Sequence, residues 1–220
     1  MSKRSRIVAI ANSKGGVGKS TLATNLAVEG ALAGLAVLLV DTDPQSSAAV
    51  FAASRDEARP AFRVIQMNQP ILHRELPELS APYDLVLIDT GARENKTFRS
   101  SIASSQLVLV PVTPSAYDIW ASEEVFTVID ELGATLDLTT RVVLNQVIPR
   151  TRVAREALEA LEEMVDEHGV ALLETRIHSR VAWKMASSQG LSVTEYEPRG
   201  AAAAELRALW AELDLARKPE

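Results

Sequence analysis

Six short apolar runs, rich in β-branched residues, recur along this 220-residue chain and constrain its fold more than any other feature. Within each run the apolar residues are continuous and do not alternate with polar ones. This is the pattern of parallel strands that are buried on both faces of a sheet. The runs cover residues 6–11, 36–41, 62–67, 84–89, 107–112 and 141–147.

Helical stretches lie between most of these runs. Residues 21–33 are rich in alanine and leucine, residues 154–168 carry apolar and acidic side chains on opposite faces, and residues 201–216 have apolar side chains at helical spacing. Strands that alternate with helices in one sheet are joined by right-handed crossovers. We therefore predict an α/β fold, a doubly wound, mostly parallel β-sheet with helices on both faces, in a single domain over residues 1–220.

The composition excludes several classes of protein. The chain has no cysteine, which removes disulfides, thiolate metal sites, iron–sulfur clusters and cysteine nucleophiles. Its apolar runs are too short to span a membrane, and the basic start, MSKRSR, leads directly into the first predicted strand and not into a signal peptide. We therefore expect a cytoplasmic protein. Because the net charge is −6, contact with DNA would need a local basic patch.

A glycine- and lysine-rich stretch follows the first predicted strand and leads into the first predicted helix. In a doubly wound sheet, ligands bind beyond the carboxyl ends of the strands, where this stretch would lie. Glycines let successive backbone N–H groups point at phosphate oxygens, and the positive end of the helix dipole adds to the attraction. We expect Lys19 to reach the terminal phosphates and the Ser20 hydroxyl to ligate Mg²⁺. The residues expected to hold the nucleotide are Gly15, Gly16, Val17, Gly18, Lys19, Ser20 and Thr21.

This stretch departs from the usual phosphate loop, G-x-x-x-x-G-K-[ST], because Ser13 takes the place of the first glycine and Lys14 follows it. It resembles the deviant Walker A motif, K-G-G-x-G-K-[ST], of the ParA/MinD family of partitioning and positioning ATPases, which are P-loop NTPases. The resemblance implies that Lys14 crosses a dimer interface to the nucleotide of the partner subunit. Two facing triphosphates repel each other, and a lysine from each side would neutralise charge and make dimerisation depend on ATP.

Three aspartates follow apolar runs. Asp41 and Asp43 end the second run, and Asp89 ends the fourth. Such carboxylates suit a hydrated Mg²⁺ at the edge of a sheet, although an aspartate in this position also caps helices or makes turns. Both stretches resemble the other nucleotide motifs of the ParA/MinD family, which implies that Asp43 positions the attacking water and that Asp41 and Asp89 hold Mg²⁺, largely through its waters. Gly91 and Ala92 stand where the family commonly has prolines, so we expect this loop to switch differently.

Asn145 ends the sixth run, in the stretch VVLNQVIP. A side-chain amide there can hydrogen-bond a purine base, although an ordinary turn asparagine is the alternative. A GTPase normally has an acidic residue two positions later to recognise the amino group of guanine, and this chain has Val147. The sequence therefore favours ATP over GTP.

Two further stretches, residues 110–125 and 190–209, resemble small ParA-type proteins. Because the phosphate loop begins by residue 14, we expect the short form, without an N-terminal helix-turn-helix extension. Relatives of the nitrogenase-reductase kind need cluster cysteines, which are absent. MinD-like members end in a basic amphipathic membrane helix, whereas residues 209–220 are balanced in charge, so we expect no membrane anchor.

Several basic residues are candidates for contact with DNA, because the ATP dimers of ParA-type proteins bind DNA without sequence preference. Arg180 and Lys184 are four residues apart, so a helix would place them on one face. A solvated helix face is the alternative. The tryptophans, Trp120 among them, are expected to pack in the core. The DNA candidates are Arg180, Lys184, Arg152 and Arg199, with Arg150, Arg155 and Arg176 as further basic positions.

The resemblance implies a slow, Mg²⁺-dependent ATPase whose catalytic residues are Lys14, Lys19 and Asp43. It would form a homodimer on ATP, bind nucleoid DNA non-specifically and position a cargo. A ParB-like protein or cargo adaptor would stimulate hydrolysis. The cargo is open: a plasmid, a chromosome or a protein compartment. The alternatives are a MinD-like membrane switch, a metabolic ATP-dependent ligase or kinase on the same fold, and a scaffold that binds ATP without hydrolysing it.

Overall fold

The computed structural model describes residues 5–93, 95–149 and 152–216. Seven strands form one sheet in the order β3-β2-β4-β1-β5-β6-β7, and every neighbouring pair is parallel. The predicted α/β fold with a doubly wound sheet is thus confirmed. The strands are β1 (Arg6–Ile10), β2 (Val37–Asp41), β3 (Arg63–Gln66), β4 (Leu85–Asp89), β5 (Leu107–Val112), β6 (Thr139–Val147) and β7 (Ala171–His178).

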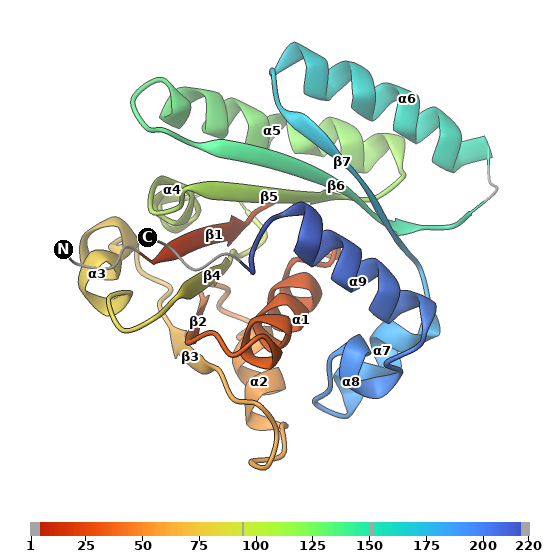
Figure 1. Ribbon diagram of the computed structural model, residues 1–220. Helices are drawn as coiled ribbons and strands as arrows, with labels where there is room; N and C mark the ends of the chain where they lie inside the picture. Colours follow the sequence, from red (N-terminus) through yellow and green to blue (C-terminus); the bar gives the residue numbers. More distant parts are fainter. Residues whose placement is uncertain (1–4, 94, 150–151, 217–220) are drawn as a thin grey trace.

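Helices cover both faces of the sheet (Figure 1). One face packs against α1 (Lys19–Leu32), α2 (Ser47–Ala53), α7 (Val181–Ser188), α8 (Val193–Tyr196) and α9 (Ala201–Glu212). The other face packs against α3 (Leu72–Leu79), α4 (Lys96–Ala103), α5 (Ala116–Gly133) and α6 (Arg152–Glu167). The three helices predicted from the sequence correspond to α1, α6 and α9.

The continuous apolar runs are explained by cores on both sides of the sheet. Successive strand residues point to opposite faces, so Leu39 and Leu87 pack in the core beneath α1 and α9, while Leu38 and Val86 pack in the core beneath α3. Each of these four side chains is at most 1% exposed. A strand that is buried in this way on both faces has no room for a polar side chain until its end, which is where the aspartates stand.

The strand β7 has no counterpart among the predicted runs. It lies at the edge of the sheet, and only Leu173 and Ile177 among its residues are buried. The two buried positions are four apart and so lie on one face of the strand, but the residue between them on that face is the polar Thr175, and the charged Glu174 and Arg176 stand on either side of it. The run ALLETRIH therefore lacks the pattern that identified the other strands.

The expectation that all tryptophans pack in the core is wrong for one of them. Trp183 and Trp210 are 8% and 9% exposed, but Trp120 in α5 is 65% exposed and forms a T-shaped ring contact with Tyr117, which is itself 76% exposed. Within the described part of the chain, none of the helices combines the length and the apolar composition that crossing a membrane requires.

A valine at position 30 tests how tightly α1 is packed. A Cβ there would lie 2.7 Å from Cγ2 of Val37, so Gly30→Val is expected to lower the free energy of unfolding by about 1–3 kcal/mol through overpacking. The matched control is Gly133→Val at the end of α5, where a Cβ would meet nothing within 4 Å; it should change stability by less than about 0.5 kcal/mol. Urea unfolding followed by circular dichroism measures both, and equal losses would contradict the tight contact.

Candidate functional site

The glycine-rich loop lies between β1 and α1, at the carboxyl edge of the sheet. Gly16 and Gly18 have φ angles of +80° and +95°, in the left-handed region that favours glycine, and a Cβ on Gly18 would come within 2.3 Å of Nδ2 of Asn145. A cleft of about 320 Å³ opens beside the loop. Its walls combine the predicted phosphate-site residues with the ends of other strands: Gly15, Gly16, Gly18, Lys19, Ser20, Thr21, Asp43, Gln45, Ser47, Ala92 and Gln146.

Lys19 is the first residue of α1 and is only 6% exposed. Its Nζ donates a hydrogen bond of 2.8 Å to the backbone oxygen of Lys14, across the loop. Burial lowers the pKa of Lys19, and the carboxylates of Asp89 and Asp43 oppose that shift. The side chain is therefore a nearly buried cation beside the cleft, as the prediction of a phosphate-binding lysine requires.

Asp41 and Asp89 end the neighbouring strands β2 and β4 in the same register. Asp89 is fully buried, and neither of its carboxylate oxygens has a hydrogen-bond partner among the described residues. Burial raises its pKa to about 7, the nearby Asp41 adds to the rise, and the Ser20 hydroxyl and Lys19 oppose it. Ser20 thus lies near Asp89 without meeting the geometry of a hydrogen bond. Such an unpaired buried carboxylate suits a cation.

The two aspartates after β2 shape the turn that follows it. The two oxygens of the Asp41 carboxylate accept 3.1 Å hydrogen bonds from the backbone N–H groups of Asp43 and Ala49. Asp41 therefore makes a turn and holds the start of α2, which is the alternative that the sequence left open. Asp43 is half-buried, lines the cleft and accepts a hydrogen bond of 2.9 Å from the backbone of Gln45.

Asn145 lies at the other side of the loop and is 4% exposed. Its Nδ2 donates a 2.7 Å hydrogen bond to the backbone oxygen of Val17. The next residue, Gln146, has a φ of +56° and donates through Nε2 to the backbone oxygen of Gly16, at 2.6 Å. The sequence analysis missed Gln146, although its place directly after Asn145 at a strand end was a usable signal. The side-chain amides of Asn145 and Gln146 bind two carbonyl oxygens of the loop. The N–H groups of the loop are therefore directed away from these two side chains.

A second cleft, of about 440 Å³, adjoins the loop at Gly18 and Asn145. Arg180 and Lys184 line it together, although Arg180 precedes α7 with an extended backbone and does not lie on the helix as expected. Arg180 caps α7 and pairs with Glu205 at 2.6 Å, an acceptor that it shares with His178. These two basic residues therefore border the site at the loop, and the charge of Arg180 is partly neutralised by an acidic neighbour.

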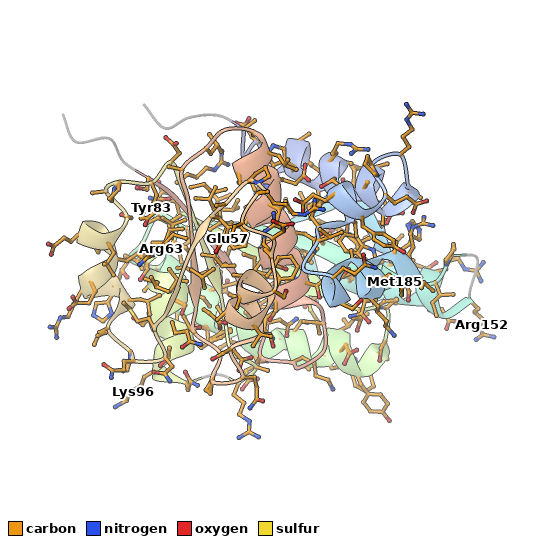
Figure 2. All side chains as sticks on the ribbon, turned by 90° about the horizontal axis from the view of Figure 1, so that it is seen from below. Glu57, Arg63, Tyr83, Lys96, Arg152 and Met185 are labelled. Carbon is orange, nitrogen blue, oxygen red and sulfur yellow. The ribbon has the colours of Figure 1, made fainter. Side chains whose placement is uncertain are left out.

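The remaining DNA candidates do not join them. Arg152 begins α6, which packs on the opposite face of the sheet from α7, and its side chain is 81% exposed and paired with Glu156 at 2.6 Å. Figure 2 shows it projecting from the edge of the molecule. Arg199 is exposed in the turn before α9. Arg150 lies outside the described residues. The basic candidates are thus spread over both faces of the sheet.

Lys14 turns away from the cleft. Its Nζ lies 3.3 Å from Oδ1 of Asp118 on α5, and its side chain is 45% exposed. A hollow of about 430 Å³ beside it is lined by Asp118, Ile148 and the loop glycines. The sequence analysis did not identify Asp118, because nothing local to it marks a contact with a residue more than 100 positions away.

A third cleft, also of about 430 Å³, lies on the other side of Asp43. The loop that follows β4, with Gly91 and Ala92, forms one wall, and Asn68 and Arg93 contribute polar groups. No function was predicted for this space. A Cβ on Gly91 would meet its nearest atom, Cα of Asp43, at 3.7 Å, which is an ordinary van der Waals contact, so the position has room for a Cβ.

The raised pKa of Asp89 predicts how stability depends on pH. The folded protein favours the protonated form of Asp89. The stability that this group contributes is therefore complete below its ordinary pKa of 3.8 and is lost as the pH rises through about 7. Asp89→Asn keeps the shape and removes the charge, so it should raise the free energy of unfolding of the nucleotide-free protein at pH 8 by about 2–4 kcal/mol. Its gain at pH 5 should be smaller. Urea unfolding without Mg²⁺ measures both, with Asp137→Asn, an exposed site, as control; equal gains at the two pH values would contradict the assignment.

Two solved structures resemble this one. The apo structure of McdA from Cyanothece superposes with a TM-score of 0.82 at 17% identity, over 96% of this chain and 100% of that chain. MinD of Pyrococcus horikoshii in complex with Mg-ADP superposes with a TM-score of 0.76 at 21% identity, over 96% of each chain. At these identities the likeness bears on the fold.

Sequence comparison extends the likeness. "Maintenance of carboxysome distribution protein A" of Gloeobacter kilaueensis is 35% identical over 95% of this chain and 94% of its own length. The chromosome-partitioning ATPase Soj of Thermus thermophilus is 29% identical over 98% of this chain and 97% of its own. The family model described as CbiA, the CobQ/CobB/MinD/ParA nucleotide binding domain, matches residues 8–193. With the loop, its two lysines and the buried carboxylates at one sheet edge, this match identifies the chain as a member of the CobQ/CobB/MinD/ParA nucleotide-binding family.

Proposed function

We propose that this protein is a ParA-type ATPase that dimerises when it binds ATP and uses slow, partner-stimulated hydrolysis to position a cargo. The observation that carries the proposal is the divergence of the two loop lysines. Lys19 is buried beside the cleft, while Lys14, five residues earlier, points away from it on the surface. A phosphate loop that bound only the nucleotide of its own subunit would need Lys19 but not Lys14.

The geometry supports the following hydrolytic roles. Lys19 and the backbone N–H groups of the loop bind the phosphates, and Asp43, half-buried at the cleft, orients the attacking water. Mg²⁺, held by Ser20 and Asp89 with Asp41 through water, would supply charge neutralisation at the phosphates. The unpaired oxygens of Asp89 support this assignment. Asp43 is the one acidic side chain among the described residues that line this cleft, so we expect slow intrinsic turnover.

The base of ATP is assigned to the second cleft, beside Gly18 and Asn145. Its wall combines an apolar ring, Trp183, with polar groups of Asn145 and Ser179, the mixture that suits a purine. In this arrangement Asn145 serves the loop through its Nδ2 and leaves its carbonyl oxygen to accept from the base.

A homodimer is supported by apolar side chains around Lys14. Tyr117, Trp120 and Ile148 are 76%, 65% and 60% exposed. Ile148 lines the same hollow as Asp118, the partner of Lys14, and the two aromatic rings flank Asp118 on α5. Large apolar side chains that gather at a polar site are typical of a surface that another protein covers. A second copy would bring its own nucleotide to Lys14.

The cargo and the location are inferred from the relatives. Similarity to a carboxysome distribution protein and to Soj supports a cytoplasmic, nucleoid-associated protein that positions a protein compartment or a DNA molecule. A ParB-like protein or a cargo adaptor would stimulate hydrolysis. Non-specific contact with DNA is proposed first for Lys184 and Arg180, which line one cleft, and then for Arg152 and Arg199, which lie elsewhere on the surface and would have to reach the DNA as part of a dimer. A MinD-like membrane role is disfavoured because the apolar side chains of α9, such as Leu206 and Trp210, are used in the core.

A second candidate is an ATP-dependent ligase or kinase for a small molecule. The polar third cleft next to Asp43 favours it, since such an enzyme needs a substrate pocket beside the terminal phosphate. It leaves Lys14 without a role. Measuring ADP release separates the two: the ParA-type ATPase releases ADP in buffer with DNA and partner alone, whereas a ligase needs a small acceptor. A scaffold that does not hydrolyse ATP would release none in either case.

Dimerisation on ATP is the first test of the proposal. Multi-angle light scattering should give the mass of one chain without nucleotide and of two chains with a non-hydrolysable ATP analogue. Lys19→Ala should stay monomeric because it cannot bind the phosphates, and Lys14→Ala should stay monomeric although it binds nucleotide. Asp43→Ala should remain a dimer with ATP itself, because hydrolysis is lost. A single-chain mass for the wild type with the analogue would refute the proposed function.

Binding to DNA is the second test. With ATP, the protein should retard DNA of unrelated sequences equally, and Lys184→Ala, Arg152→Ala and Arg199→Ala should each weaken binding and reduce the slope of log K against log salt by about 1 per lost phosphate contact. Arg74→Ala, a 70% exposed cation on α3, is the matched control.

Because Arg180 and Lys184 also border the second cleft, the affinity of their alanine variants for nucleotide must be measured separately by fluorescence titration. Arg180→Ala should weaken DNA binding less than Lys184→Ala, since Glu205 already neutralises part of its charge. Retardation that does not require ATP, or that is unchanged in every variant, would remove the DNA role.

A further inference from the structure

Lys14, the residue proposed to act across the dimer interface, is not free in the isolated chain. Its ammonium nitrogen lies 3.3 Å from Oδ1 of Asp118 on α5. We infer that Asp118 is a positioning residue for Lys14: it holds the lysine on its own subunit, and the pair must open before Lys14 reaches the nucleotide of a second copy. This inference rests on the proposed function and deepens it.

Asp118 is held in place by two hydroxyl groups, one on its carboxylate and one on its backbone. Its Oδ2 accepts a hydrogen bond from the Thr113 hydroxyl, and its backbone oxygen accepts one of 2.8 Å from the hydroxyl of Ser122. The side chain is only 20% exposed. Asp118 also lies in the first turn of α5, where the helix dipole favours a negative charge. The acceptor for Lys14 is therefore fixed by the fold and is not a mobile surface group.

The start of the phosphate loop is anchored to the same two turns of α5. Nδ2 of Asn12 donates to Oγ of Ser122 at 3.2 Å, and the Ser13 hydroxyl donates to the backbone oxygen of Ala121 at 3.2 Å. The Oδ1 of Asn12 in turn accepts a 2.9 Å hydrogen bond from the backbone N–H of Lys14. The backbone of Lys14 is thus aligned with α5 independently of its ammonium, so opening the Asp118 pair moves the side chain alone.

The two lysines of the loop are linked through the same residue. Nζ of Lys19 donates to the backbone oxygen of Lys14. A phosphate that draws the Lys19 ammonium into the cleft takes a positive charge away from this carbonyl, on the residue whose side chain Asp118 holds. Occupation of the subunit's own site therefore changes a contact of the Lys14 backbone, whereas release of the Lys14 side chain depends on its ion pair with Asp118.

The size of the effect follows from the exposure of the pair. With side chains that are 45% and 20% exposed, the ion pair is partly screened by water. Its loss should favour the released lysine by roughly twofold to fivefold per subunit. Because a symmetric dimer releases two such lysines, the association constant should rise by the square of this factor, about 4-fold to 25-fold.

The test is sedimentation equilibrium with the non-hydrolysable ATP analogue. Asp118→Asn keeps an oxygen for the Thr113 hydroxyl and removes the charge, so it should dimerise about 4-fold to 25-fold more tightly than the wild type. Asp118→Glu keeps the charge and should stay near the wild-type value. Glu124→Gln, an equal change of charge at an exposed position of α5, is the matched control and should have no effect. Thermal unfolding confirms that the variants are folded.

A double variant separates positioning from other causes. Lys14→Ala with Asp118→Asn should remain monomeric, because the gain acts through Lys14. A dimeric double variant, or Asp118→Asn that dimerises no more tightly than the wild type, would overturn the inference and leave the proposed function standing. A wild type that does not dimerise would instead refute the proposed function and the inference with it.

A measurement on the unaltered protein gives an independent result. Amine acylation of the nucleotide-free protein, read by mass spectrometry, should modify Lys14 several-fold more slowly than the exposed Lys96, because the contact with Asp118 restrains the Lys14 ammonium on its own subunit. Equal rates at the two lysines would overturn the inference.

Discussion

The site depends on a buried group of opposite charges at the carboxyl edge of the sheet. Asp41 and Asp89 end adjacent strands in register, and Lys19 begins the helix that follows the loop. Burial disfavours the charged form of all three side chains. The opposite charges of the lysine and the two acids offset part of this free-energy cost. The rest remains, because neither carboxylate oxygen of Asp89 has a hydrogen-bond partner among the described residues. The nucleotide-free protein is therefore less stable than it could be, and a phosphate and a metal ion that bound here would restore this stability.

The loop is shaped by its neighbours as much as by its own glycines. Asn145 and Gln146 hold its carbonyl oxygens from one side, and α5 holds Asn12 and Ser13 from the other. These contacts come from residues about 100 to 130 positions away in the chain. The loop therefore takes its form only when β1, β5 and β6 have paired, so a competent phosphate site reports that the whole centre of the sheet has folded.

Much of this was predictable from the sequence, for physical reasons. Central parallel strands are buried on both faces, so their apolar runs are continuous. An aspartate that follows such a run therefore lies at the carboxyl edge of the sheet, where the strand ends. The edge strand β7 was not predicted because Glu174, Thr175 and Arg176 interrupt its apolar residues, which an edge position allows. The partners of Lys14 and Arg180, which are Asp118 and Glu205, were equally hidden, since only the tertiary fold brings them within reach.

One hydrogen bond within the loop has a consequence for ligand capture. The Lys19 ammonium is bound to the Lys14 carbonyl, inside its own loop. A phosphate oxygen that binds Lys19 would replace the Lys14 carbonyl oxygen as the acceptor of the Lys19 ammonium. Because this ammonium is already held inside the loop, the loop backbone need not rearrange around it. The loop loses its conformational entropy when the protein folds, so ligand binding does not have to order it a second time. A loop that is ordered before its ligand arrives loses less conformational freedom on binding, which would favour fast association with a phosphate.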